Sequence, residues 1–437
     1  MKNIYLLFLG SLLLNISCST DLDEVPPNIA SSDSLTDFEG VLNAAYYYQL
    51  GAVTPMAIMG DFRADNALML ESPYTEFDEY DPGLTAMEDQ FFGPFYTALY
   101  RSILSANNVI ENSEDPTQIG EAKFLRGLSY FKLVQAFGDV TVILTSPDIG
   151  DIPTFDLTRK PMTEVYNNVI VPDLQAAISA LGVTNVNGRA SKLAAQSLLG
   201  KVYVHMGNFA SAEPHLAAAV NGAAAGGISL QANYADIFVT DLNSEIIFAN
   251  QVSSSVEDEY GFSDFWSWFL GNDTKSPKPL DSRLISAFDA SPGDLRRAIN
   301  MDDVALNSPK YPQVGGPEHD WIEIRLADVI LLYAETLNEN GVPATTVLPL
   351  LDAIRERAGL DKLDPNTINT QALVRQAIYN ERRLELAFEG HRWFDLVRTG
   401  TVETEMGETV NSNYYFFPIP ISEILASDGV ITQNPGY

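Results

Sequence analysis

Apolar residues recur at three- and four-residue spacing along most of the chain, which is the period of an amphipathic helix. A shorter segment, 245–251, has instead the pattern of a strand. The chain is therefore predicted to be mostly α-helical. The predicted helices cover residues 35–50, 94–112, 119–137, 163–181, 191–206, 210–219, 322–339, 345–358 and 370–389.

Two helical regions share one spacing of small and large apolar residues. In a tetratricopeptide repeat, a small residue lets two helices approach closely, and a glycine supplies the turn between them. The sequence predicts helix-pair repeats of this type, which are scaffolds for binding rather than catalytic folds. The first pair contains Gly200, Tyr203, Gly207, Phe209, Ala212, Leu216 and Ala219, and the second contains Ala334, Leu337, Gly341, Leu350 and Ala353, at offsets shifted by 134 positions.

The first residues have the pattern of a signal peptide. Lys2 precedes two apolar runs, 4–9 and 12–14, which are too short to span a hydrocarbon core of about 30 Å as a helix. Cys18, the only cysteine, follows where a bacterial lipoprotein signal is cut and its thiol acylated. We expect residues 1–17 to be a lipoprotein signal and Cys18 to carry lipid. The alternative is an ordinary signal peptide with a chance cysteine.

Residues 18–34 are typical of a tether. Three acidic residues between positions 21 and 24 precede Pro26-Pro27 and several serines, a composition that favours a semi-extended linker. No low-complexity segment follows, so residues 35–437 are expected to form a single domain.

The formal net charge of −32 limits the partners of the protein. A strongly acidic surface repels polyanions, so nucleic acid and sulfated or uronic polymers are poor candidates. Neutral ligands remain.

A stretch near the C-terminus, 378–398, carries charged residues at three-residue spacing. The stretch is predicted to be helical, with an interruption at Gly390, and this spacing predicts three ion pairs within it. It contains no nucleophile, metal cluster or phosphate loop, so we interpret it as structural. The predicted pairs are Arg382 with Glu385, Glu389 with Arg392, and Asp395 with Arg398.

This stretch, together with the final Gln433-Asn-Pro-Gly-Tyr437, closely resembles the C-terminal signature of the SusD/RagB family. The resemblance extends to further segments in the family's order, and it covers the chain from about residue 18 to the end. These segments are 121–126, 130–139, 188–209, 324–335 and 417–420.

The resemblance implies a SusD-like fold with a loop-rich ligand-binding region. It also implies a surface lipoprotein of the outer membrane that captures oligosaccharide or polysaccharide and delivers it to a SusC-like TonB-dependent transporter. The acidic patch behind Cys18 resembles the export signal of Bacteroidetes surface lipoproteins, so the protein is expected to face the cell exterior.

Enzyme signatures are absent from the sequence. Gly200-Lys201 lacks the upstream glycine of a phosphate-binding loop, and no zinc-protease or nucleophile-elbow motif occurs. The four histidines are scattered, so no metal site or cofactor is predicted. Two alternatives stay open: a RagB-like peptide binder and, because carboxylates are abundant, a surface glycoside hydrolase.

Sugar rings stack on aromatic faces and hydrogen-bond to fixed polar groups on loops. The segment 260–269 carries Tyr260, Trp266 and Trp268, and an extended backbone places these two tryptophans on one face. In the family, ligand-contacting aromatics come from this region and from an early loop. The early candidates here are Arg63, Asp65 and Asn66, followed by Tyr74 and Tyr80, and Trp321 is a further candidate. The alternative for each aromatic is core packing, and for Arg63, Asp65 and Asn66 it is hydrogen bonding to backbone at a turn.

The lipid anchor predicts a simple fractionation result. Cys18→Ala removes the acylated thiol, so most of the protein should leave the membrane fraction, because stable anchoring needs more than one acyl chain. Quantitative blotting of membrane and soluble fractions measures the change. Full membrane retention of the variant contradicts lipidation at Cys18.

Overall fold

The structure is a computed structural model and describes residues 38–146, 155–184, 187–253, 259, 265–271, 276–312 and 318–437. The chain divides into two compact units, 1–37 and 38–437, and all described residues belong to the second. The predictions for the signal peptide, the tether and Cys18 therefore lie outside the described residues, as does Tyr260.

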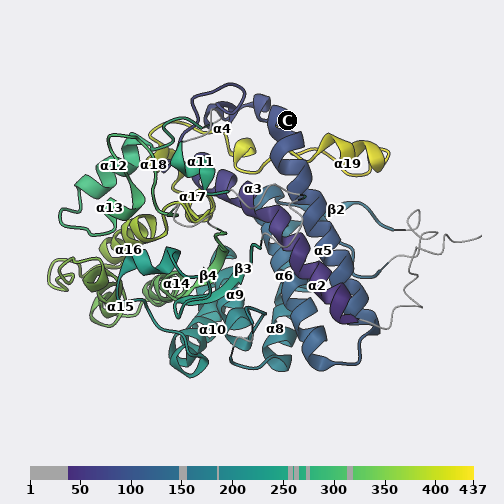
Figure 1. The fold of residues 1–437 in the computed structure, drawn as a ribbon, viewed down its shortest axis with the longest axis horizontal. Helices are drawn as coiled ribbons and strands as arrows, with labels where there is room; N and C mark the ends of the chain where they lie inside the picture. The colour runs from purple at the N-terminus through teal and green to yellow at the C-terminus, as the bar shows by residue number, and fades with distance from the viewer. Residues whose placement is uncertain are drawn as a thin grey trace, which may run out of the picture. The chain divides into compact units, whose positions relative to one another are not determined.

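Three long helices pack side by side in the second unit (Figure 1). A buried amide joins them, because Gln49 on the first donates to Ser102 Oγ on the second (2.8 Å) and to Ser129 Oγ on the third (2.5 Å). Pro116 at the first helical position and the Asp115 side chain, which accepts from the N–H of Thr117, begin the third helix. The helices are α2 (Phe38–Gln49), α5 (Gly93–Asn112) and α6 (Pro116–Phe137).

Six further helices correspond to the remaining predicted ranges. Each of the nine ranges predicted from the apolar spacing therefore contains a helix. Polar residues at their starts explain several boundaries: Ser191, Asn208 and Thr370 each accept a hydrogen bond from an N–H three residues on. The prediction of a mostly α-helical chain is confirmed. The six are α8 (Val171–Ala180), α9 (Lys192–His205), α10 (Phe209–Gly222), α14 (Leu326–Glu339), α15 (Ala344–Arg357) and α16 (Gln371–Leu386).

One predicted helix begins too early. Residues 322–325 belong to strand β4 (Trp321–Arg325), which pairs antiparallel with β3 (Ile246–Asn250). Ile322 and Ile324 are both buried, and this two-residue spacing is that of a strand. Ile322 and Leu326 are four residues apart, and this spacing led to the prediction of a helix. The strand predicted at 245–251 is confirmed by β3. Among the described residues, the other strands are the short pair β1 (Val140–Thr141) and β2 (Arg159–Lys160).

The two predicted helix pairs are present as α9 with α10 and α14 with α15, and α10 also packs on α14. Gly207 and Gly341 follow the first helix of each pair with φ of 69° and 79°, a conformation that favours glycine. At Gly200, an added Cβ would lie 2.5 Å from Leu216 Cδ2, so only glycine allows this close approach. Their assignment as tetratricopeptide repeats stays a prediction.

The signature stretch is broken where the sequence predicts a break. Helix α16 ends at Leu386, and α17 (Arg392–Thr399) begins after a turn in which Phe388 and Gly390 have φ of 64° and 74°. Asp61 holds this turn, because its carboxylate accepts from the backbone N–H of Phe388 (3.0 Å) and of Gly390 (2.7 Å).

Of the three predicted ion pairs in the stretch, only Asp395 with Arg398 forms (2.7 Å). The other two predictions are wrong. Arg382 pairs with Asp328 (2.7 Å) and Asp395 (3.0 Å), and Glu389 with Arg325 (2.7 Å). Three-residue spacing brings side chains together only within one continuous helix, and the turn at 387–391 separates Glu389 from Arg392. Burial also brings partners from distant segments within reach.

A buried network of ion pairs surrounds Glu385. Its carboxylate accepts from Arg325 (2.6 Å), Arg296 (2.9 Å) and Arg357, which come from three other segments. Burial raises the pKa of Glu385, but the three guanidinium groups prevail and hold the pKa well below its usual range. Arg325 also donates to Glu389 (2.7 Å) and to Glu245 (2.9 Å).

Removing Arg325 should destabilise the fold strongly. In Arg325→Leu, the buried carboxylates of Glu245, Glu385 and Glu389 lose a shared cation, which should lower the free energy of unfolding by about 3–5 kcal/mol. Urea denaturation monitored by circular dichroism measures the loss. The control is Arg297→Leu, which removes a partly exposed guanidinium paired with Asp289 and Asp303 and should cost about 1 kcal/mol or less. Equal losses in both variants contradict the central role of the network.

Candidate functional site

Two aromatic loops that lie far apart in the sequence meet in the structure. The Tyr74 ring stands edge-on to the Trp268 ring, with centroids 5.5 Å apart, and both contact Phe91. Tyr74 is half-buried, and its hydroxyl donates to Gln90 Oε1 (3.0 Å). Trp268 is only 6% exposed, so it supports Tyr74 from within the core. Aromatic side chains of both predicted ligand-binding regions therefore lie together.

The two tryptophans do not share a face. Residues Ser267–Leu270 form a short helix, α11, and Trp266 precedes it with a helical backbone conformation. Residues two apart on a helix are separated by about 200°, so the prediction of an extended segment with both rings on one side is wrong. Trp268 points inward, whereas Trp266 is half-buried and makes an edge contact with His319 at 6.2 Å.

A hollow of about 260 Å³ is lined in part by the early loop, through Asp78 and Tyr80. Asp78 of α4 (Glu76–Glu79), Arg283 of α12 (Ser282–Asp289) and Met406 of α18 (Val402–Met406) are among its lining residues, and these three helices lie in the upper part of Figure 1. Its walls combine apolar side chains with carboxyl, guanidinium and phenol groups, a mixture that suits a ligand with both apolar and hydroxyl surface. The lining residues are Leu68, Met69, Leu70, Asp78, Tyr80, Asp281, Arg283, Met406 and Glu408.

Two polar side chains of the hollow differ in how strongly other protein groups hold them. Arg283 is held by Asp281, with Nε at 3.1 and 3.0 Å from the two carboxylate oxygens. Among the described residues, Asp78 accepts from the N–H of Met69 at a long 3.4 Å, and burial raises its pKa to about 7. Near neutral pH, Asp78 therefore exchanges between a carboxyl that donates and a carboxylate that accepts.

The polar candidates of the early segment are buried and already have protein partners. Arg63 is fully buried, donates to the carbonyl oxygen of Phe77 (2.7 Å) and lies 4.3 Å from the Tyr80 ring centre. Asp65 accepts from Arg392 (2.7 Å) and from Arg383 (2.8 Å).

Asn66 donates to Asp61 Oδ1 (2.9 Å) and accepts from Arg383 (3.2 Å). The hydrogen-bonding groups predicted to meet sugar hydroxyls are thus largely used within the protein. Only Arg63 binds backbone carbonyl groups, as the alternative expected, whereas the side chains of Asp65 and Asn66 pair with other side chains.

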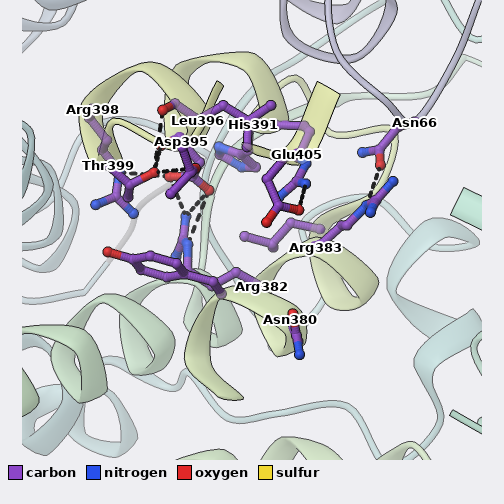
Figure 2. A pocket seen from close by; sticks show the side chains of 14 residues that line it. Asn66, Asn380, Arg382, Arg383, His391, Asp395, Leu396, Arg398, Thr399 and Glu405 are labelled. Carbon is purple, nitrogen blue, oxygen red and sulfur yellow. Dashed lines mark hydrogen bonds and ion pairs between the residues drawn. The ribbon is translucent and has the colours of Figure 1, made fainter. Parts of the chain in front are cut away.

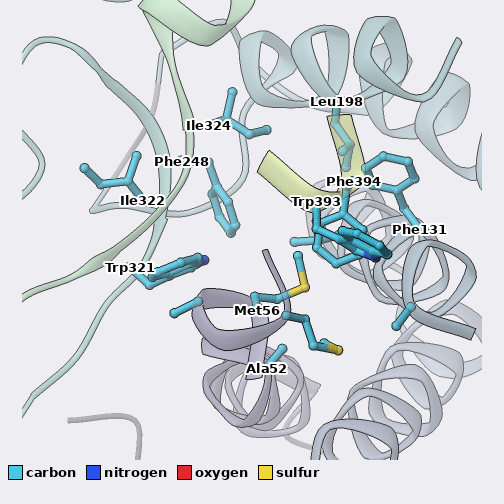
Figure 3. Packing of buried hydrophobic residues seen from close by; sticks show 14 of the residues in the cluster. Ala52, Met56, Phe131, Leu198, Phe248, Trp321, Ile322, Ile324, Trp393 and Phe394 are labelled. Atoms are coloured by element: carbon cyan, nitrogen blue, oxygen red, sulfur yellow. The ribbon is translucent and has the colours of Figure 1, made fainter. Parts of the chain in front are cut away.

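Two of the candidate aromatic rings are also core residues. Tyr80 is 9% exposed, stacks on Trp393 with centroids 5.7 Å apart, and donates to the carbonyl oxygen of Arg63 (2.9 Å). Trp321 is 3% exposed and stands edge-on to Phe265 at 5.1 Å. Figure 3 shows Trp321 and Trp393 among the packed hydrophobic side chains. Of the described candidate rings, Trp266 and Tyr74 retain partial exposure.

A second recess lies over the signature stretch, and Figure 2 shows that its lining is rich in paired charges. Arg382 donates to Asp395, and Arg392 donates to Asp65 and Glu405. Burial, and then Lys201, lowers the pKa of His391 to about 4. The free space is about 20 Å³, which admits a water molecule but no sugar ring. This recess is part of the structural network.

Other kinds of site find no support among the described residues. No cluster of three or more His, Cys, Asp or Glu residues there has the arrangement of a metal site. No helix in the described ranges is long and apolar enough to cross a membrane.

The chain matches two family models. Residues 19–204 match a model described as "Starch-binding associating with outer membrane", and residues 300–411 match the model of the SusD family. Over the whole length of both chains, the protein is 25% identical to "SusD-like protein P2" of Formosa agariphila.

Solved structures share the fold. A SusD superfamily protein from Parabacteroides distasonis superposes with a TM-score of 0.76 at 21% identity, covering 94% of this chain and all of that one. A "Laminarin binding SusD-like protein" superposes with a TM-score of 0.71 at 24% identity, covering 92% of this chain and 99% of that one. These structures confirm the SusD-like fold expected from the signature stretch. The two family models, which match residues 19–204 and 300–411, and the SusD-like relative assign the chain to the SusD/RagB family.

Proposed function

We propose that the protein binds neutral oligosaccharides or polysaccharides at the surface formed by Trp266, Tyr74 and the neighbouring hollow. The observation that carries the proposal is the contact between Tyr74 and Trp268, which joins the two aromatic loops into one surface. A starch-binding family description and a laminarin-binding relative support a glycan ligand.

The surface supplies both kinds of contact that a sugar needs. The faces of Trp266 and Tyr74 suit the apolar C–H face of a pyranose. Asp78, Arg283 and Glu408 line the hollow and offer acceptors and donors for hydroxyl groups. The net charge of −32 favours an uncharged polymer over an acidic one.

We further propose that capture is followed by delivery rather than by hydrolysis. In this scheme, lipid on Cys18 holds the protein at the outer membrane facing the exterior, and a SusC-like TonB-dependent transporter receives the glycan. A glycoside hydrolase needs a second carboxylate opposite its acid. Asp281 and Glu408 share the hollow with Asp78. Asp281 is ion-paired with Arg283, so of these two Glu408 is the one left to act as a second carboxylate, and an assay for released sugar tests it. Release of reducing sugar by the purified protein contradicts the binding-only proposal.

Replacing the half-exposed tryptophan tests the binding surface. Trp266→Ala should weaken binding of malto- or laminari-oligosaccharides by about 1–3 kcal/mol, because an aromatic anchor is lost, while lowering the melting temperature less than the loss of a fully buried ring does. Isothermal titration calorimetry and thermal melting provide the two readouts.

The matched control is Trp268→Ala two residues on. Its ring is core, so the substitution should cost about 3–5 kcal/mol of stability. A folded Trp266→Ala variant with wild-type affinity for every glycan that the wild type binds removes this ring from the site.

The raised pKa of Asp78 predicts a pH-dependent stability. An unfolded aspartate titrates near pH 4, whereas Asp78 titrates at about 7 in the fold, so the folded protein binds the extra proton between these values. Stability should therefore fall as pH rises through this window, and Asp78→Asn should lessen the fall.

Urea titrations between pH 4 and pH 8 measure this dependence. The control is Asp361→Asn, which alters an exposed aspartate and should leave the slope unchanged. A slope in Asp78→Asn identical to that of the wild type contradicts the assignment.

A further inference from the structure

Near the C-terminus, the chain forms a projection, which we define as residues 420–430. It contains the short helix α19 (Ile421–Ala426), none of whose residues is buried. In Figure 1, α19 extends outward beyond α5 and β2 at the edge of the second unit. Its packing contacts with other helices and strands are sparse.

The base of the projection is held firmly. Gln433 closes it, because its side-chain oxygen accepts from the N–H of Ile419 (2.7 Å) and its amide donates to the carbonyl oxygen of Ile419 (2.8 Å). Asn434 donates to the carbonyl oxygens of Phe417 (2.7 Å) and Phe137 (3.1 Å). These contacts mount the projection on the core in a defined position.

The projection exposes three large apolar side chains. Ile421 and Leu425 lie one helical turn apart and are 51% and 69% exposed, and Val430 beyond them is 44% exposed. Two large apolar residues at this spacing on an exposed helix form the pattern with which a helix enters a hydrophobic groove. A firmly mounted apolar surface facing water is typical of a protein contact site.

Charge restricts what covers this surface. The projection carries two acidic residues, Glu423 and Asp428, and no Lys or Arg occurs from Thr399 to Tyr437. A second copy of the chain has the same charge of −32 and is repelled, as is an anionic lipid surface. Complementarity therefore favours a different protein with basic side chains beside an apolar groove.

We propose that the projection is a docking element that inserts Ile421 and Leu425 into an apolar groove, bordered by Lys or Arg, on a partner protein. The exposed area of three side chains is far below the roughly 1,000 Å² of a stable interface, so the projection is one anchor within a larger contact. The identity of the partner as the transporter rests on the proposed function.

The test uses the full-length lipidated protein, co-expressed with a SusC-like TonB-dependent transporter from the same genome and purified in mild detergent. The double variant Ile421→Ser, Leu425→Ser should recover at least about tenfold less transporter than the wild type, as expected when central anchors are lost. Its melting temperature and its affinity for glycan should be unchanged.

Two matched variants test the surface and its charge. Val304→Ser alters an apolar residue that is 94% exposed outside the projection, and it should recover wild-type amounts of transporter. Glu423→Lys with Asp428→Lys should reduce recovery and weaken its dependence on salt, because the complementary charge is reversed.

Each other outcome overturns the inference in a distinct way. Wild-type recovery by the double Ser variant excludes docking through the projection while leaving delivery intact. Absence of transporter from the wild-type preparation refutes delivery and docking together, and glycan affinity is measured separately. A wild-type dimer that the Ser variant dissociates, or binding of the Cys18→Ala protein to anionic vesicles that requires Leu425, assigns the surface to a second copy or to lipid instead.

Discussion

Arg325 is the residue on which the interior of this protein depends, because its guanidinium joins the helix, turn and strand segments that carry Glu385, Glu389 and Glu245. All of these groups are buried, so each charge lacks the solvation that water would provide. Removal of Arg325 takes one cation from three buried carboxylates at once, although each of them keeps another cationic partner. Arg296 and Arg357 add two further segments to Glu385. The ion pairs therefore fix the ends of these helices and strands relative to one another more precisely than apolar packing alone would.

The segment 61–66 connects the buried ion-pair network to the aromatic loops through hydrogen bonds. Asp61 holds the backbone of Phe388 and Gly390, and Asp65 binds Arg392, so the segment is attached to the signature stretch at both ends. Between these carboxylates, Arg63 donates to the carbonyl oxygen of Phe77, at the base of the loop that carries Tyr74. The polar residues that the sequence offers as ligand contacts thus hold the loop that carries Tyr74 in position.

The aromatic loops expose few rings, and a hollow with polar lining residues lies next to the early loop. Most aromatic side chains of the two loops pack on one another, as Phe77, Phe91 and Trp268 do, and they leave Tyr74 and Trp266 partly exposed. A stiff aromatic base lowers the entropy that these two rings lose on binding a ligand. The acidic charge of the chain has a separate consequence, because it disfavours the approach of acidic ligands, anionic membrane surfaces and acidic proteins.

The sequence by itself determined the features that depend on local spacing. The helical ranges follow from apolar periodicity, the helix starts follow from residues such as Ser191 and Thr370, and the break at Gly390 follows from glycine. The pairing of Asp395 with Arg398 also follows, since both residues lie on one short helix. The signature residues additionally indicated the family, which the two family models support.

Only the tertiary structure decided which partner each buried charge has and which aromatic ring is exposed. Arg382 is three residues from Glu385, but it meets Asp328 and Asp395 instead, because long-range packing brought those carboxylates closer. Trp266 and Trp268 are the same residue type and lie two positions apart. A single helical turn nevertheless directs one side chain toward the surface and the other into the core. Spacing along the chain specifies which face of an element a side chain occupies, whereas what covers that face depends on segments hundreds of residues away.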